Sequence, residues 1–146
     1  MRSPRAWLSP AADRLRYQIN AAFPDRDKQS DGWLGDARHA LRTSQHNPDP
    51  TTGVVRAIDV DAHLLKGSPN LNLAFDLADQ LRLAGKNDKS KRIAYVIFHG
   101  RICSPKSLWR WVKYRGINPH NHHIHISFTK TGDNNPTSFE IPILKG

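Results

Sequence analysis

Histidine is the residue type in this sequence that points most directly to chemistry. The chain contains eight histidines, and four of them lie between His120 and His125. The imidazole nitrogen binds zinc, and neutral imidazole also accepts protons near pH 7. The alternatives are a surface-exposed histidine tract without function and an expression artefact; an artefact is not expected, because the cluster is internal and a strand-like pattern follows it. The cluster therefore predicts a metal site, a general base, or both.

Alternation along that strand sorts the histidines by face. Successive side chains of a β-strand point to opposite faces of the sheet. His123 and His125 then share a polar face, whereas Ile124, Ile126 and Phe128 share the other, which we expect to face the core. Two imidazoles on a polar face, backed by packed apolar residues, would form a rigid platform for a metal ion.

An aspartate in a second apolar strand is the next unusual feature. Within the stretch from Gly53 to Asp61, Ile58 and Val60 take one face and Asp59 takes the other. A carboxylate inside an apolar strand is costly unless it is paired or binds a metal. Asp59 is therefore a candidate ligand, whereas Asp61 at the end of the strand suits a salt bridge or a turn cap.

The composition limits which metal chemistry is open to the chain. A catalytic zinc ion needs three protein ligands with nitrogen or oxygen atoms and an open position for water. The sequence has no H-E-x-x-H motif, and its only glutamate is Glu140, near the C-terminus. A glutamate base beside the metal is therefore not expected. A histidine would have to take the proton of the water instead.

Helices and strands must position these residues. Serine–proline pairs predict helices that begin at Pro10 and Pro69; the first should end near Phe23, and the second should have Gly85 as its C-cap. The apolar face of the second helix would consist of Leu71, Ala74, Phe75, Ala78 and Leu81. Apolar runs predict strands over residues 53–61, 93–98, 101–103 and 123–129. The long segments 24–53 and 104–122 are expected to be loops that carry function.

Length and composition predict one compact domain over residues 1–146. The single cysteine cannot form an internal disulfide, and no long apolar stretch predicts a signal peptide or a membrane span. We therefore expect synthesis in the cytoplasm.

The net charge of +9 should attract polyanions such as nucleic acid, anionic lipid or an anionic cell wall. The basic residues are scattered in several groups, which favours diffuse attraction over a dedicated basic tail.

Four short motifs, in this order, resemble the zinc peptidase superfamily of lysostaphin, the D-alanyl-D-alanine carboxypeptidases and the sonic hedgehog domain. They are Ser44-Gln45-His46, Gly53, Ala57-Ile58-Asp59 and His123-Ile124-His125. The superfamily pattern is S-x-H, then G-x-A-x-D, and later H-x-H. The resemblance covers residues 32–128. Residues 42–48 and 118–125 are similar to phage endolysin peptidases of that superfamily.

The resemblance implies that one zinc ion is bound by His46, Asp59 and His125, and that His123 or His120 is the base. It also implies an α+β fold, a small single domain in which two to three helices pack on a central antiparallel sheet, as in the hedgehog and D-alanyl-D-alanine peptidase domains.

Residues beside the first ligand contact the substrate or steady the site in that superfamily. Arg42 and Ser44 take those positions here. The alternative for Arg42 is a cation at a helix end, where it would interact with the helix dipole.

Two departures from the superfamily pattern leave alternatives open. The carboxypeptidases carry a carboxylate three residues before the last ligand, where this chain has His122; the murein endopeptidases carry H-x-x-H-x-H, which this chain matches. Twelve residues separate His46 from Asp59, against six in the short motif, so both Asp59 and Asp61 are candidates for the metal ligand.

These observations predict a zinc-dependent peptidase of the phage endolysin type that cleaves stem or cross-link peptides of peptidoglycan. We expect a monomer without specific nucleic-acid binding or membrane insertion, which acts on the cell wall after its release. The sequence does not determine which bond is cut.

One alternative is a metal-dependent nuclease, suggested by the positive charge and by His120-Asn121-His122, although the HNH motif spreads its residues over a hairpin and a helix. The other is a non-catalytic zinc-binding module of the cell wall.

Overall fold

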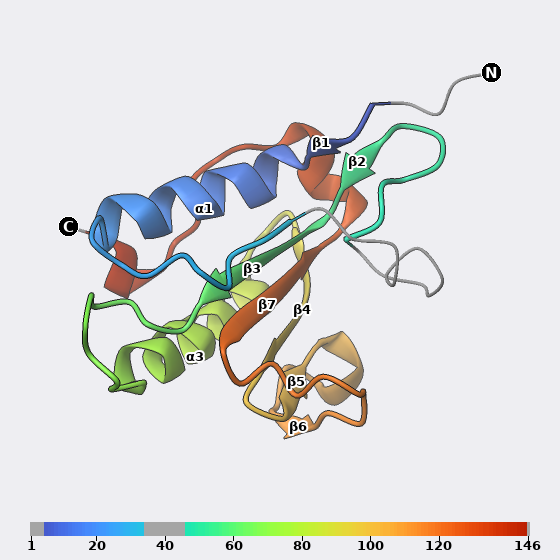
Figure 1. Cartoon of the computed structure of the whole chain (residues 1–146). Helices are drawn as coiled ribbons and strands as arrows, with labels where there is room; N and C mark the ends of the chain where they lie inside the picture. The colour runs from blue at the N-terminus through green and yellow to red at the C-terminus, as the bar shows by residue number, and fades with distance from the viewer. Residues whose placement is uncertain (1–4, 34–45, 146) are drawn as a thin grey trace.

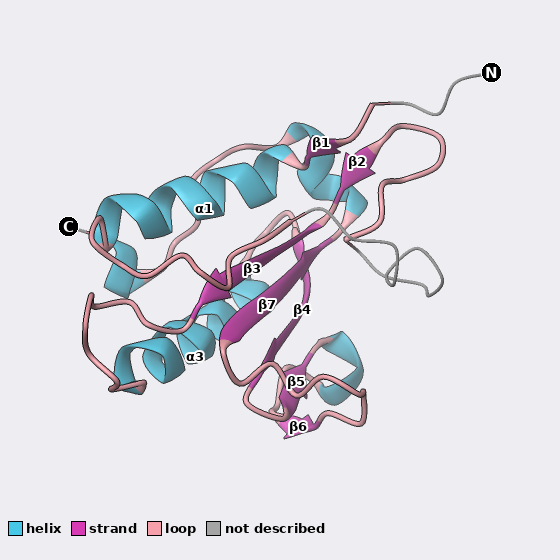
Figure 2. Cartoon of the chain, in the orientation of Figure 1, coloured by secondary structure: helices cyan, strands magenta, loops and turns pink. Residues whose placement is uncertain are grey.

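A five-stranded antiparallel sheet forms the centre of the computed structural model, which describes residues 5–33 and 46–145 (Figures 1 and 2). Its strand order is β3-β7-β4-β5-β6. The strands are β3 (Ala57–Asp61), β4 (Ile93–Phe98), β5 (Arg101–Cys103), β6 (Val112–Lys113) and β7 (His123–Phe128). The predicted α+β fold, a small single domain with an antiparallel sheet and two helices, is confirmed.

The helices α1 (Pro10–Ala22) and α3 (Asn72–Asn87) pack against the apolar face of the sheet. That face carries Ile58, Ile124 and Ile126, all of them buried. The polar face carries the histidines of β7, as the alternation predicted. The sheet thus separates a hydrophobic core from a face on which polar chemistry can take place.

The first helix begins and ends where the sequence predicted, but the second does not. It begins at Asn72 rather than Pro69, because the preceding residues form side-chain-capped turns in which Asn70 Oδ1 accepts the backbone N–H of Asn72 at 2.8 Å. Phe75 is also not part of the core: it is 46% exposed and packs its ring against Phe98, with 4.9 Å between the ring centroids.

Gly85 lies inside α3 and is not the C-cap, a role that belongs to Asp88. The reason for glycine is close packing: a Cβ atom at this position would lie 2.5 Å from Cη2 of Trp109. The indole ring thus contacts the backbone of the helix, and this contact anchors the segment between β5 and β6.

Replacing Gly85 by alanine should therefore destabilise the fold. The better helix propensity of alanine gains about 1 kcal/mol, but forcing a methyl group into the indole ring costs about 1–3 kcal/mol. Denaturant unfolding should show a net loss for Gly85→Ala and a change within about 0.5 kcal/mol for Lys86→Ala, an exposed control on the same helix. A Gly85→Ala protein more stable than wild type would contradict the packing described here.

The predicted strand 53–61 is divided at Arg56 into β2 (Val54–Val55) and β3, and β2 pairs in parallel with β1 (Trp7–Leu8). The Arg56 guanidinium binds Asp49 at 3.0 Å and Asp133 at 2.6 Å. These ion pairs turn the chain between the two strands and connect it to the 3₁₀ helix η2 (Lys130–Asn134).

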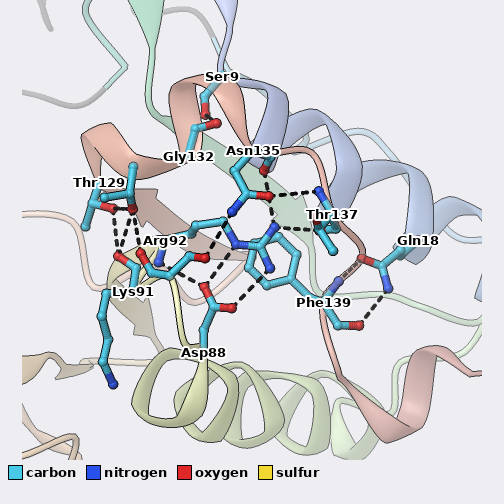
Figure 3. A network of polar contacts seen from close by, with 12 residues as sticks. Ser9, Gln18, Asp88, Lys91, Arg92, Thr129, Gly132, Asn135, Thr137 and Phe139 are labelled. Atoms are coloured by element: carbon cyan, nitrogen blue, oxygen red, sulfur yellow. Dashed lines mark hydrogen bonds and ion pairs between the residues drawn. The ribbon is translucent and has the colours of Figure 1, made fainter.

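The C-terminal segment is tied to both helices by a polar network around Arg92 (Figure 3). The buried Arg92 guanidinium binds Asp88 of α3 and donates to the carbonyls of Asn135 and Thr137. It also lies 3.9 Å from the ring centroid of Phe139. Gln18 of α1 hydrogen-bonds to the backbone N–H and C=O of the same phenylalanine, at 2.8 and 3.0 Å. The chain then ends in the 3₁₀ helix η3 (Pro142–Leu144).

The segment 104–122 is more ordered than the predicted loop. It contains the 3₁₀ helix η1 (Pro105–Ser107) and the strand β6, which pairs with β5. Two residues give too short a pattern for strand periodicity, so the sequence did not reveal β6. Among the described residues, no helix is long and apolar enough to cross a bilayer.

Candidate metal centre

His46, Asp59 and His125 come together on the polar face of the sheet. Asp59 on β3 and His125 on β7 are directly paired residues, and His125 Nδ1 lies 3.1 Å from Asp59 Oδ1. His46, from the loop before β2, places its Nε2 3.2 Å from His125 Nδ1 and 3.3 Å from Asp59 Oδ2. Two ligand atoms of a tetrahedral zinc ion are about 3.4 Å apart when each bond is about 2.1 Å. The three groups are thus positioned to bind a metal ion.

The orientation of each imidazole is fixed by a second hydrogen bond. His46 Nδ1 donates to the carbonyl of Trp33 at 2.9 Å, which leaves the Nε2 lone pair directed at the centre. His125 Nε2 lies 2.7 Å from Ser127 Oγ; when Nε2 donates to this oxygen, the lone pair is on Nδ1, which can then bind a metal ion in place of the hydrogen bond to Asp59. Metal-binding histidines commonly use such outer partners to fix their tautomer. Tyr95 of β4 stacks on the His125 ring, with 5.5 Å between the ring centroids and 15° between the ring planes.

Charge in the centre suits a divalent cation. Burial by itself raises the pKa of Asp59, but hydrogen bonds from His125 and His46 and their charge bring it well below its usual range. Burial lowers the pKa of His125. Burial also opposes protonation of His46, yet the hydrogen bond and charge of Asp59 raise its pKa above 6.5. The centre therefore offers one ionised carboxylate, and the proton held by His46 must leave before both imidazoles can bind a metal ion.

Metal affinity should decrease as the pH falls. A histidine must lose its proton to bind a metal ion, and the raised pKa of His46 starts this competition above pH 6.5. Asp59 does not contribute in this range because it stays ionised. Zinc dissociation constants measured by chelator competition should rise steeply from pH 8 to pH 5. An affinity independent of pH would mean that His46 is not a ligand.

His123 and His120, the two candidate bases, lie beside this centre. His123 Nε2 is 3.6 Å from Asp59 Oδ1, and the His123 side chain is partly accessible. The ring centroid of His120 lies 5.0 Å from that of His123 and 5.3 Å from that of His125. Asp59, His120 and His123 also form a second group whose ligand atoms lie within 4.8 Å of one another.

The loop that carries His120 folds over the centre because it pairs with the β4–β5 turn. His99 N–H donates to the carbonyl of His120 at 3.0 Å, and Gly100 N–H donates to that of Pro119 at 2.8 Å. His120 is buried, and its Nδ1 has no hydrogen-bond partner among the described residues. Burial and the neighbouring His125 and His123 lower its pKa to about 4. His120 is thus a neutral imidazole at physiological pH.

The remaining predicted residues take other positions. Asp61 turns away from the centre: its Oδ2 accepts the N–H of Ser30 at 3.0 Å and its Oδ1 accepts that of His63 at 2.9 Å. Of the two candidate aspartates, Asp59 is the one beside His46 and His125. His122 is exposed. Arg42 and Ser44 lie outside the described residues.

The loop before Trp33 supports the candidate metal centre, and sequence reasoning missed this role. Gly32 and Asp59 exchange backbone hydrogen bonds of 2.7 and 3.2 Å, which extends the sheet by one residue beyond β3. Arg26, fully buried, holds this loop through two bonds to the Asp31 carboxylate, at 2.8 and 2.6 Å. The Trp33 carbonyl is thereby placed against His46. Only the length of the loop hinted at this role.

A cavity of about 770 Å³ lies elsewhere, between the end of α3 and the C-terminal segment. Arg92 lines it, but its guanidinium is already bound by Asp88 and two carbonyls. No histidine is among the described residues that line the cavity. We therefore assign the chemistry to the histidine face of the sheet.

Comparison of the chain with protein-family models, with curated proteins and with solved structures gives no significant match. The likeness of the short motifs to the zinc peptidase superfamily therefore stays a hypothesis. The assignment of function depends on the geometry of the centre itself.

Proposed function

We propose that this protein is a zinc-dependent peptidase that cleaves stem or cross-link peptides of peptidoglycan. The observation that carries the proposal is the convergence of His46 Nε2, Asp59 and His125 Nδ1, with two further imidazoles beside them. Two nitrogen ligands and one carboxylate are the donor set of many catalytic zinc sites. The order of the motifs along the chain, similar to that in phage endolysin peptidases, supports peptidoglycan as the substrate.

Zinc bound by these three residues would polarise the scissile carbonyl and make a nearby water acidic. His123 is accessible and adjacent to Asp59, so it is placed to take the proton of the attacking water and later to give it to the leaving amine. His120 is neutral, and its imidazole N–H can donate a hydrogen bond to the oxygen that becomes negative during the reaction. Tyr114 covers His120, with 5.6 Å between ring centroids, and limits the access of water to it.

The proposal is tested by digestion of purified peptidoglycan. Zinc-loaded protein should release new amino termini, and mass spectrometry of the fragments should identify the bond that is cut. A chelator and the Asp59→Asn variant should each abolish release, whereas His63→Ala, a histidine outside the centre, should act like wild type. We expect the active species to elute as a monomer.

Two other outcomes would replace the proposal. Metal-dependent cleavage of plasmid DNA without peptide release would make the protein a nuclease. Tight zinc binding and adsorption to cell walls, with no cleavage of either substrate, would make it a binding module.

A further inference from the structure

The net charge of the chain comes from one segment. Residues 89–132 contain nine of the 22 basic residues and none of the 13 acidic residues. The rest of the chain therefore has thirteen basic and thirteen acidic residues, and its net charge is zero. The charge of +9 is therefore carried by this segment, although its basic residues are scattered along the sequence.

Five of these cations lie on a single projecting unit. We call residues 99–119, which contain β5, η1 and β6, the β5–β6 arm; it forms one end of the molecule beyond the central strands (Figure 1). Its cations are Arg101, Lys106, Arg110, Lys113 and Arg115, and all five are exposed. Within residues 5–33 and 46–145, none of their side chains forms an ion pair or a hydrogen bond. Their charge is thus available to a partner.

Apolar side chains project from the same arm. Ile117 is 89% exposed, Leu108 is 70% exposed and Val112 is 45% exposed. The arm itself is well anchored, because Trp109 is buried against Gly85 and the N–H of Tyr114 donates to the carbonyl of Gly100 at 2.9 Å. Leu108, next to this anchor, has a left-handed backbone with φ of 56° and points outward. The exposed apolar residues thus belong to an ordered surface.

We propose that the β5–β6 arm docks the protein on the surface of an anionic lipid bilayer. Ile117 and Leu108 would enter the boundary between headgroups and acyl chains, while the cations of the same arm bind lipid phosphates. Apolar side chains among cations are the pattern by which proteins bind anionic membrane surfaces without spanning them. A nucleic acid or an anionic polysaccharide would engage the cations but leave Ile117 and Leu108 in water, so the bilayer is the better match.

Docking through the arm would bring the metal centre close to the membrane surface. Tyr114 on the arm contacts His120, which contacts His123 and His125. The proposal depends on the exposure and charge of the arm and on neither zinc nor peptidase activity. Its failure would leave the peptidoglycan and zinc assays unchanged, so the two proposals can be rejected separately.

The test is sedimentation of the full chain with vesicles of phosphatidylcholine, with and without phosphatidylglycerol. Wild type should bind only the anionic vesicles, and salt should weaken the binding. The double variant Leu108→Ser/Ile117→Ser should lose roughly tenfold or more in affinity, as should Arg110→Gln/Lys113→Gln. Leu65→Ser, 54% exposed and outside the arm, is the matched control and should bind like wild type. Thermal melting checks that each variant is folded.

Two results would overturn the proposal. In the first, wild type fails to sediment with anionic vesicles at low salt. In the second, Leu108→Ser/Ile117→Ser binds vesicles as tightly as wild type, whereas Arg110→Gln/Lys113→Gln loses binding both to vesicles and to DNA. That outcome would make the arm a general polyanion surface.

Discussion

Replacing His125 by alanine should remove the bound zinc and abolish peptidase activity. The change deletes one of the three expected ligands and leaves the partly buried Asp59 carboxylate without its closest partner, at 3.1 Å. Even outer partners of metal ligands contribute about 10–100-fold to affinity, so the loss of a ligand should exceed about 100-fold. Elemental analysis after gel filtration should find one equivalent of zinc in wild type and none in the variant.

Two further variants separate loss of metal from loss of fold. Asp59→Asn keeps the shape of the side chain but removes its charge, and it should also lose zinc. His63→Ala should keep a full equivalent, because His63 lies with Asp27 and Asp61 in a separate group. Full zinc retention in both His46→Ala and His125→Ala would reject the centre. Two equivalents in wild type and in His63→Ala, but one in His120→Ala, would assign His120 and His123 to a second ion rather than to proton transfer.

Replacing His123 by alanine should leave zinc bound but lower turnover by roughly 10²–10⁴-fold, the usual contribution of a general acid–base group. His123 lies two residues before His125 on the same face of β7, and its Nε2 is 3.6 Å from Asp59 Oδ1, so we expect it to act beside the metal ion rather than to bind it. His120→Ala should also retain zinc and lose turnover, because the imidazole that covers the centre is removed. Turnover should be compared at saturating substrate and across pH.

His122→Ala is the matched control for this prediction, since His122 is adjacent in sequence but exposed. It should have nearly wild-type turnover. An inactive His122→Ala protein with normal His123→Ala activity would mean that the chemistry uses the position where carboxypeptidases carry a carboxylate.

The parts of the fold that follow from local patterns could be predicted from the sequence. Period-two alternation gave the two faces of β7 and placed Asp59 opposite Ile58 and Val60, because one face of each strand must be buried. The proline after Ser9 gave the start of α1. These features depend on neighbouring residues alone, so the sequence contains the information in readable form.

The features that depend on distant contacts could not be predicted. Gly85 looked like a helix end, and only the position of Trp109 shows that it permits close packing instead. The Trp33 carbonyl is placed against His46 by the pairing of Gly32 with Asp59, and these two residues are far apart in the sequence. Arg26 carries no motif at all, and its role follows from a buried bond to Asp31.

The loop from Arg26 to Trp33 contains none of the expected metal ligands. Its number of residues should nevertheless affect metal affinity. Lys28 and Gln29 form its exposed tip, between the two anchoring residues. Additional residues at this tip would bulge into solvent at small entropic cost and leave the loop attached. A single residue inserted between Gly32 and Trp33 would instead move the carbonyl that orients His46, and the imidazole would be free to rotate away from the metal. Additional residues should therefore leave metal affinity unchanged at the tip of this loop and weaken it at the end of the loop.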